Sequence, residues 1–200
     1  YIVNMKGIKN DPDLDLQIIV TGMHLSPEFG LTFQEIINDG FFINNKVEML
    51  LSGDTPSAIS KSTGLGMIGL ADAFEELKPD IVTLLGDRYE LLAAASTALF
   101  ANIPIAHISG GETTTGAFDE AIRHSITKMG WWHFVAAKEY KKRVIQLGED
   151  PNRVHHVGSI SIDNIKKTKL LNKTKLEKLL GLKFKKKNLI ITYHPVTLEK

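Results

Sequence analysis

The sequence predicts an α/β protein built on a doubly wound, parallel sheet. Short apolar runs rich in β-branched residues alternate with longer segments whose apolar residues recur at helical spacing. Such nearly continuous apolar strands suit a sheet covered on both faces, and their alternation with helices implies βαβ crossovers. The expected strands are residues 16–21, 80–86, 104–108, 133–136, 153–157 and 188–193. The expected helices are residues 56–77, 89–101, 119–129, 138–147 and 162–180.

Local signals support three of these helices. Pro56 follows a polar run with capping side chains, which favours a helix start because proline fits the first turn. Asp119 stands where a carboxylate is stabilised by the positive end of a helix dipole. Residues 93–96 (AAAS) place four small side chains in one turn, so this helix is expected to pack closely against the sheet.

The chain divides into three parts by its amino-acid composition and hydrophobic pattern. Residues 1–163 are expected to form one domain, and residues 164–187 a lysine-rich helical linker with a solvated lysine face. Residues 188–200 are expected to begin a second domain that is truncated here. Because the chain starts at Tyr1 without an initiator methionine and stops just after a strand-like run, we expect it to be part of a longer protein.

Composition excludes several classes of protein. The 200 residues carry a formal net charge of +1, which argues against a general nucleic-acid binder. Cysteine is absent, so thiolate nucleophiles, thiolate metal sites and disulfides are excluded. No stretch reaches the ~18 apolar residues needed to span a bilayer, and no secretory signal is visible. We therefore expect a cytoplasmic protein that makes no membrane contact.

Polar side chains gather where the expected strands end. In open parallel sheets ligands bind in the crevice at the carboxyl ends of the strands. One strand ends directly before an Asp-Arg pair, the next runs into a glycine-rich loop at 109–116, and the last ends in Tyr-His-Pro. The residues that these ends and the helix after the loop contribute are Asp87, Arg88, Glu112, Asp119, Arg123 and His194.

Each candidate also has a purely structural explanation. Asp87 and Arg88 could form a local ion pair, and Glu112 could be a surface carboxylate. Asp119 could cap its helix, with Arg123 as its partner four residues on along a solvated face. The shared position favours a binding cleft, because all of these residues follow strands that should end on the same rim.

Two other patterns carry no site. Residues 64–69 match G-x-G-x-x-G, but they lie inside a helix-period segment, and the dinucleotide motif requires a strand, a turn and a helix. His155 and His156 are adjacent on an expected strand, so they should point to opposite faces. His194 taken alone could be a buried core histidine. We expect no metal site.

Five segments carry a family resemblance. They are 21–25 (TGMHL), 86–90 (GDRYE), 107–112 (HISGGE), 119–124 (DEAIRH) and 193–197 (YHPVT). Together, and in this order over nearly the whole chain, they resemble the hydrolysing UDP-N-acetylglucosamine 2-epimerases of sialic-acid biosynthesis.

The resemblance implies a glycosyltransferase-B arrangement, in which two Rossmann-like domains face each other across a cleft. This chain would be the N-terminal half. The family's first strand, with an arginine that contacts the nucleotide, is expected before Tyr1, and most of the UDP-binding domain is expected beyond residue 200. The resemblance also implies a homo-oligomer, a UDP-sugar substrate, and no metal or redox cofactor.

Roles carry over position by position. The catalytic set looks like Asp87, Glu112, Asp119 and His194. Which of the three carboxylates acts as acid and which as base is left open. Arg88 and Arg123 look like partners that bind the substrate phosphates or orient charge, and His24, in the upstream segment, looks like a substrate-binding residue.

The implied reaction eliminates UDP across C1–C2 of the sugar and then adds water to the resulting glycal. The products would be UDP and N-acetylmannosamine. Alternatives are a hydrolysing epimerase of UDP-N,N'-diacetylbacillosamine, a non-hydrolysing epimerase that returns a UDP-sugar, and a glycosyltransferase-B module that binds nucleotide sugars without epimerising them.

Overall fold

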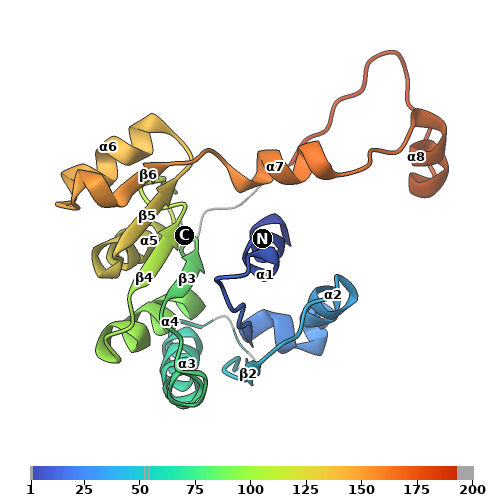
Figure 1. Cartoon of the computed structure of the whole chain (residues 1–200). Coiled ribbons are helices and arrows are strands. Elements are labelled where there is room, and N and C mark those ends of the chain that lie inside the picture. Colours follow the sequence, from blue (N-terminus) through green and yellow to red (C-terminus); the bar gives the residue numbers. More distant parts are fainter. Residues whose placement is uncertain (1, 52, 54, 193–200) are drawn as a thin grey trace.

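The computed structural model describes residues 2–51, 53 and 55–192. Its main sheet has four parallel strands in the order β3, β4, β5, β6 (Figure 1). In the register of the first three strands, Leu84 stands beside His107, and His107 beside His133. The bounds are Val82–Leu85 for β3, Ile105–Ile108 for β4, Trp132–Val135 for β5 and Val154–His156 for β6. These strands lie within the expected segments, apart from a one-residue shift at the start of β5.

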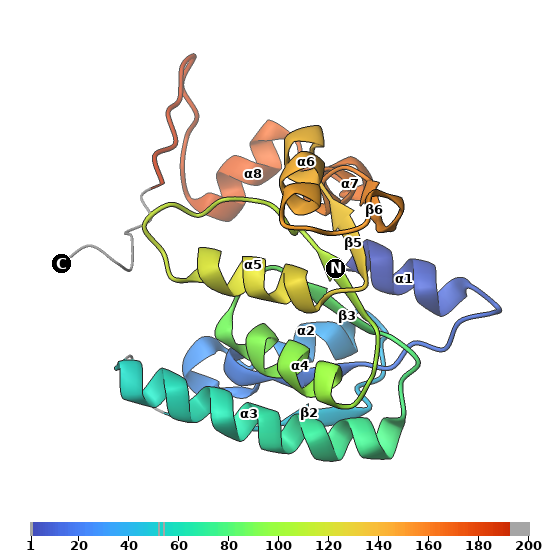
Figure 2. The ribbon, with the colours of Figure 1, turned by 90° about the vertical axis from the view of Figure 1, so that its left-hand side faces the viewer.

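Four long helices follow or precede these strands as expected. They are α3 (Pro56–Leu77), α4 (Tyr89–Phe100), α5 (Asp119–Met129) and α6 (Lys138–Gln146). In Figure 2, α4 and α5 cross the face of the sheet that is turned toward the viewer, and α3 lies outside α4. The structure thus confirms the α/β alternation and the parallel strands.

A second, smaller sheet differs from the expectation of one continuous sheet. β1 (Ile19–Thr21) pairs in parallel with β2 (Asn45–Val47), which the sequence did not predict. Val47 joins the main core with Leu70 of α3, so β2 is held against α3. Packing on a helix, rather than pairing with β3, positions this small sheet.

Short elements complete the N-terminal region. They are α1 (Ile2–Asn10), α2 (Phe33–Asn38), and the 3-10 turns η1 (Gly22–Leu25) and η2 (Pro27–Phe29). A further 3-10 turn, η3 (Pro151–Arg153), leads into β6. In the part of the chain that is described, no helix is both long and apolar enough to cross a membrane.

The lysine-rich segment is not one helix, so the expected helix 162–180 is wrong. It is split into α7 (Ile160–Lys167) and α8 (Lys173–Leu180). Asn172 starts the second helix, because its side-chain oxygen accepts the backbone N–H of Lys175 and caps the new N-terminus. Both helices extend away from the sheet (Figure 1).

The expected strand 188–193 is also not formed within its described residues. Residues 188–192 have no strand assignment, and Leu189, Ile190 and Ile191 are exposed. A strand requires a neighbour to accept its backbone hydrogen bonds, and no described strand lies beside this segment. The assignment of residues 188–200 to a second domain stays a prediction.

Small residues set the distance between α3, α4 and β2. Ala93 and Ala95 of α4 are fully buried, which confirms the close packing expected from the alanine run. A Cβ on Gly66 would lie 2.7 Å from the Met49 Cε atom, and one on Gly69 would lie 2.6 Å from the Val47 Cγ1 atom. The glycines of the G-x-G-x-x-G pattern therefore lie within α3, as expected, and two of them serve packing.

Candidate active site

Two strand ends and one helix form the candidate site. β3 ends before Gly86, whose φ of +95° turns the chain toward Asp87 and the start of α4. β4 ends before Ser109, which also adopts a positive φ of +65°. For a residue with a side chain this left-handed conformation is strained, and such strain gathers where surrounding structure fixes a backbone for function. The rim predicted from the strand order is therefore present.

Arg123 organises this rim. Its side chain projects from α5 and the residue is only 6% exposed. The guanidinium donates to the Ser109 carbonyl at 2.9 Å and to the Thr114 hydroxyl at 3.1 Å, and it forms an ion pair and hydrogen bond with Asp87. Its Nη1 atom lies 3.6 Å from a Glu112 carboxylate oxygen. One buried cation thus joins the loops after β3 and β4.

Asp119 completes the group of carboxylates. It is the first residue of α5, one helical turn before Arg123, and its charge acts on Asp87. The N-cap position is held by Phe118, so the alternative interpretation of Asp119 as the residue that caps this helix is wrong. The predicted ion pair between Asp119 and Arg123 on a solvated helix face is wrong as well, because the Arg123 side chain is buried and binds Asp87.

The environment of Asp87 changes its proton affinity. Burial raises the pKa of the Asp87 carboxyl above its usual value, and the charge of Asp119 raises it further. The charges of Arg123 and Arg88 oppose this rise without cancelling it. A carboxyl that holds its proton to higher pH than free aspartate is better suited to general acid–base chemistry than an unperturbed one.

Arg88 and His24 lie on neighbouring segments. Arg88 is the N-cap residue of α4, and its Nε atom lies 3.2 Å from Glu90, so the suggested local ion pair with Asp87 is not formed. The Nη2 atom of Arg88 lies 3.7 Å from the Met23 sulfur, next to His24 in η1. His24 is exposed and its Nδ1 atom lies 2.7 Å from the Thr32 hydroxyl. Substrate binding by Arg88 and His24 stays a prediction.

Two further expectations, the place of His194 and the absence of a metal site, stay predictions. His194 lies outside the described residues, so its place at the rim stays a prediction. Among the described residues, no three His, Asp or Glu side chains form a group that could hold a metal ion.

His107 is a structural member of the site that the candidate residues did not include. It is 0% exposed, and its ring lies 2.9 Å from the Gly86 carbonyl and 3.1 Å from the Thr127 hydroxyl. Burial lowers the pKa of His107 from 6.5 to about 4, so the ring is neutral. In the neutral ring Nε2–H donates to Gly86, which leaves Nδ1 to accept from Thr127.

This histidine links the turn before Asp87 with the helix that carries Arg123. The signal for it was present in the sequence, because a polar residue inside an apolar strand must find hydrogen-bond partners when that strand is buried. All residues of β4 are buried.

Comparison with known proteins decides the family. The family model described as UDP-N-acetylglucosamine 2-epimerase matches residues 6–200. The chain belongs to this family.

Relatives within the 2-epimerase family refine this result. The chain is 52% identical over 191 residues to a GDP/UDP-N,N'-diacetylbacillosamine 2-epimerase (hydrolyzing) of Campylobacter jejuni, covering 96% of the chain and 50% of the relative. It is 38% identical over 195 residues to a UDP-N,N'-diacetylbacillosamine 2-epimerase (hydrolyzing) of Legionella pneumophila, covering 98% and 52%. The chain thus spans about half the length of these curated relatives.

A solved 2-epimerase structure confirms the fold. The UDP-GlcNAc 2-epimerase of Neisseria meningitidis bound to UDP-GlcNAc superimposes with a TM-score of 0.73 at 19% identity, covering 90% of this chain and 49% of that one. The Rossmann-like α/β fold expected from the resemblance is therefore correct.

Proposed function

We propose that the full-length protein containing this chain is a hydrolysing 2-epimerase of a UDP-linked 2-acetamido sugar. The observation that carries the proposal is the meeting of Asp87 and Glu112 on one buried arginine at the carboxyl ends of β3 and β4, with Asp119 near enough for its charge to act on Asp87. Membership of the 2-epimerase family supports it.

The reaction explains why such a site needs several carboxylates. No carbonyl activates the hydrogen on C2 of the sugar. The C1–O bond must therefore break first, with its electron pair leaving on the diphosphate, so that the ring develops oxocarbenium character. Neighbouring anions stabilise this cation. A carboxylate then removes the C2 proton, and the C1–C2 double bond of a glycal forms.

The second half of the reaction runs as an addition. Water supplies a hydroxyl group to C1 and gives its other proton to a carboxylate, while a protonated carboxyl supplies a proton to C2 from the face opposite to the one that lost it. The products are UDP and a free sugar inverted at C2. Asp87, with its raised pKa, is suited to hold the proton in one of these steps.

The two arginines have different surroundings, which suggests different roles. Arg123 is buried and its charge is opposed by Asp87 and Glu112, so we assign it to positioning the carboxylates. The Arg88 side chain is 52% exposed and is better placed to reach a diphosphate. His24, on the neighbouring segment, would contact the same part of the substrate.

The proposal also names the sugar nucleotide on which the enzyme acts. The sequence predicted UDP-N-acetylglucosamine as substrate and N-acetylmannosamine as product. The relatives at 52% and 38% identity are both named for N,N'-diacetylbacillosamine nucleotides, whereas a UDP-N-acetylglucosamine 2-epimerase of Neisseria meningitidis is 33% identical. We therefore place UDP-N,N'-diacetylbacillosamine first and UDP-N-acetylglucosamine second.

The test is to incubate the full-length protein with each nucleotide sugar in D2O and follow the products by NMR. The proposal predicts free 2-epimeric sugar, equimolar UDP, and deuterium at C2. An epimeric UDP-sugar as final product would show a non-hydrolysing enzyme, and unchanged substrate with tight UDP binding would show a binding module.

A pair of variants ties this activity to the site. Asp87→Asn should lower kcat by ~100- to 10,000-fold, as expected for loss of an acid–base group. Glu139→Gln, at an exposed position on α6, is the matched control and should leave kcat unchanged. Equal activity of the two variants would contradict the role of Asp87.

A further inference from the structure

The loop that carries Glu112 receives little support from the Glu112 side chain itself. Residues 109–116, called the Glu112 loop, leave the end of β4 and form the long connection that enters α5 (Figure 2). The Glu112 side chain is 31% exposed, and its ionic contact within the described residues is the 3.6 Å approach to Arg123. Gly110 and Gly111 precede it directly. The direction of this carboxylate therefore depends on how the backbone of the loop is held.

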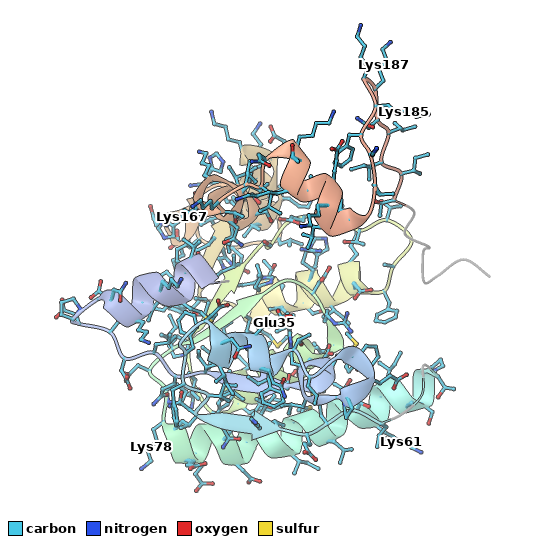
Figure 3. The ribbon with its side chains drawn as sticks, turned by 90° about the vertical axis from the view of Figure 1, so that its right-hand side faces the viewer. Glu35, Lys61, Lys78, Lys167, Lys185 and Lys187 are labelled. Carbon is cyan, nitrogen blue, oxygen red and sulfur yellow. The ribbon has the colours of Figure 1, made fainter. Side chains whose placement is uncertain are left out.

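Arg143 holds this backbone from helix α6. Lysines such as Lys185 and Lys187 extend into solvent at the top of Figure 3. The Arg143 side chain is instead partly buried, and its Nη1 group donates a hydrogen bond to the Gly111 carbonyl. That carbonyl belongs to the peptide unit that joins Gly111 to Glu112, so the contact acts on the backbone immediately before the carboxylate.

The Arg143 guanidinium is not engaged by a carboxylate. It forms no ion pair with any Asp or Glu that the structure describes. Its other contact is with the Tyr140 ring on the same helix, 5.8 Å from the ring centroid. A hydrogen bond from a charged donor is stronger than one between neutral groups, and more so where water is partly excluded. The bond to Gly111 is therefore a strong tether on the peptide before Glu112.

Gly111 is shaped to lie on α6. Its φ is +77°, and a Cβ there would stand 2.5 Å from the Tyr140 carbonyl oxygen and 2.9 Å from the Val144 Cγ2 atom. Val144 is 0% exposed. A glycine is therefore required here, because a side chain would push the loop off the helix. Packing fixes the distance of this peptide from α6, and the Arg143 hydrogen bond fixes the direction of its carbonyl.

The far end of the Glu112 loop is held by α5. The Glu120 carboxylate accepts the backbone N–H of Thr114 at 2.8 Å, and Arg123 donates to the Thr114 hydroxyl at 3.1 Å. Glu112 thus lies between one anchor on α5 and one on α6. The anchor on α6 is directly adjacent to it in the chain.

We propose that Arg143 is a positioning residue for Glu112, acting through the Gly111–Glu112 peptide and not through contact with the substrate. This role rests on the proposed function, in which Glu112 is one of the reacting carboxylates. Displacement of a catalytic group by ~1 Å can lower a rate ~100-fold. A side chain that fixes the backbone next to such a group therefore affects the chemical step without touching the reacting atoms.

Removing the donor tests this role in the full-length protein with the nucleotide sugar that the wild type turns over. Arg143→Met keeps an apolar side chain and should lower kcat about 10- to 100-fold. KM should change less than ~2-fold, because Arg143 contacts no residue assigned to substrate binding. Arg143→Lys keeps a donor for the single carbonyl and should recover most of kcat. Lys142→Met removes the same charge from the exposed face of α6 and should leave kcat unchanged.

Dependence on Glu112 separates positioning from a general structural role. Glu112→Gln alone should lower kcat ~100- to 10,000-fold, measured with enzyme in excess over substrate. Once the carboxylate is absent its direction no longer matters, so adding Arg143→Met should lower the residual rate by less than ~2-fold. A purely structural role would give the same loss in both backgrounds.

A second variant reaches the same peptide from the loop. Gly111→Ala places a methyl group against the Tyr140 carbonyl and should lower kcat by a factor similar to that of Arg143→Met. The two changes together should cost little more than either alone, because both displace one peptide. Arg143→Gln keeps a polar side chain at this position and takes the place of Arg143→Met if that variant shows no folded circular dichroism spectrum.

Several results would overturn the role of Arg143 while the proposed function, which is judged on the products of the wild type, stands. They are full activity of Arg143→Met, an equal loss of kcat in Lys142→Met, a raised KM with unchanged kcat, and an equal loss with and without the Glu112 carboxylate. A wild type that returns only an epimeric UDP-sugar would refute the hydrolysing function, and Arg143 would then be judged on the rate of epimerisation in the same variants.

Discussion

Replacing His107 with glutamine should make the folded protein less sensitive to acid. The buried ring has a pKa of about 4, against 6.5 for a histidine in solvent. Between these values the unfolded chain binds a proton that the folded chain does not, so the free energy of unfolding rises with pH in this window and falls as pH drops from 6.5 toward 4. Glutamine can still donate to the Gly86 carbonyl, and it does not titrate.

The size of the effect follows from the two pKa values. At pH 5 the unfolded histidine is almost fully protonated and the folded one is about one-tenth protonated, which corresponds to about 2 kcal/mol of lost stability relative to pH 7.5. The wild type should lose about 2 kcal/mol more than His107→Gln over this range. Other titrating groups, including buried His133, are common to both proteins and cancel in the comparison.

Urea unfolding followed by circular dichroism at pH 7.5 and pH 5 measures this difference directly. His107→Gln should be less stable than the wild type at pH 7.5, because the amide fits the cavity of an imidazole imperfectly. The comparison rests on the change with pH and not on that offset. His156→Gln, at an exposed position on β6, is the control and should follow the wild type. The same pH-dependent loss in His107→Gln and wild type would refute the assignment to His107.

Three further substitutions test other parts of the structure. Arg123→Ala should lower the free energy of unfolding by about 3 kcal/mol, because it removes the hydrogen bonds of a buried guanidinium and leaves the partly buried Asp87 carboxylate without its partner; a loss below about 1 kcal/mol in urea unfolding would contradict this ion pair. Thr55→Ala removes the side-chain cap of α3 and should cost about 1 kcal/mol, seen as a lower melting temperature, with an unchanged value counting against the cap. Gly69→Ala should destabilise by about 1–3 kcal/mol despite alanine's higher helix propensity, because the new methyl group overlaps Val47; a more stable variant would show that β2 moves freely away from α3.

Much of the candidate site could be predicted from the order of strands and loops. Asp87 and Glu112 follow consecutive strands of a parallel sheet, and the carboxyl ends of such strands share one edge. The proximity of these two carboxylates could therefore be predicted from the order of the strands. Which cation lies between them was decided only by the tertiary structure. Sequence spacing favoured Arg88 as the partner of Asp87, whereas the fold selects Arg123, which is 36 residues away. His107 was passed over because its importance lies in two long-range hydrogen bonds.

The sequence by itself determined the fold class and the start and end of the long helices. Apolar periodicity, proline at the start of α3 and the alanines of α4 act between residues that are close along the chain. Only the tertiary structure decided that β1 pairs with β2 in a separate sheet, that Arg123 is buried, and that the pKa of Asp87 is raised. Those properties depend on which distant segments exclude water from a group or offer it a charge, and the order of residues along the chain does not specify those neighbours until the segments have packed together.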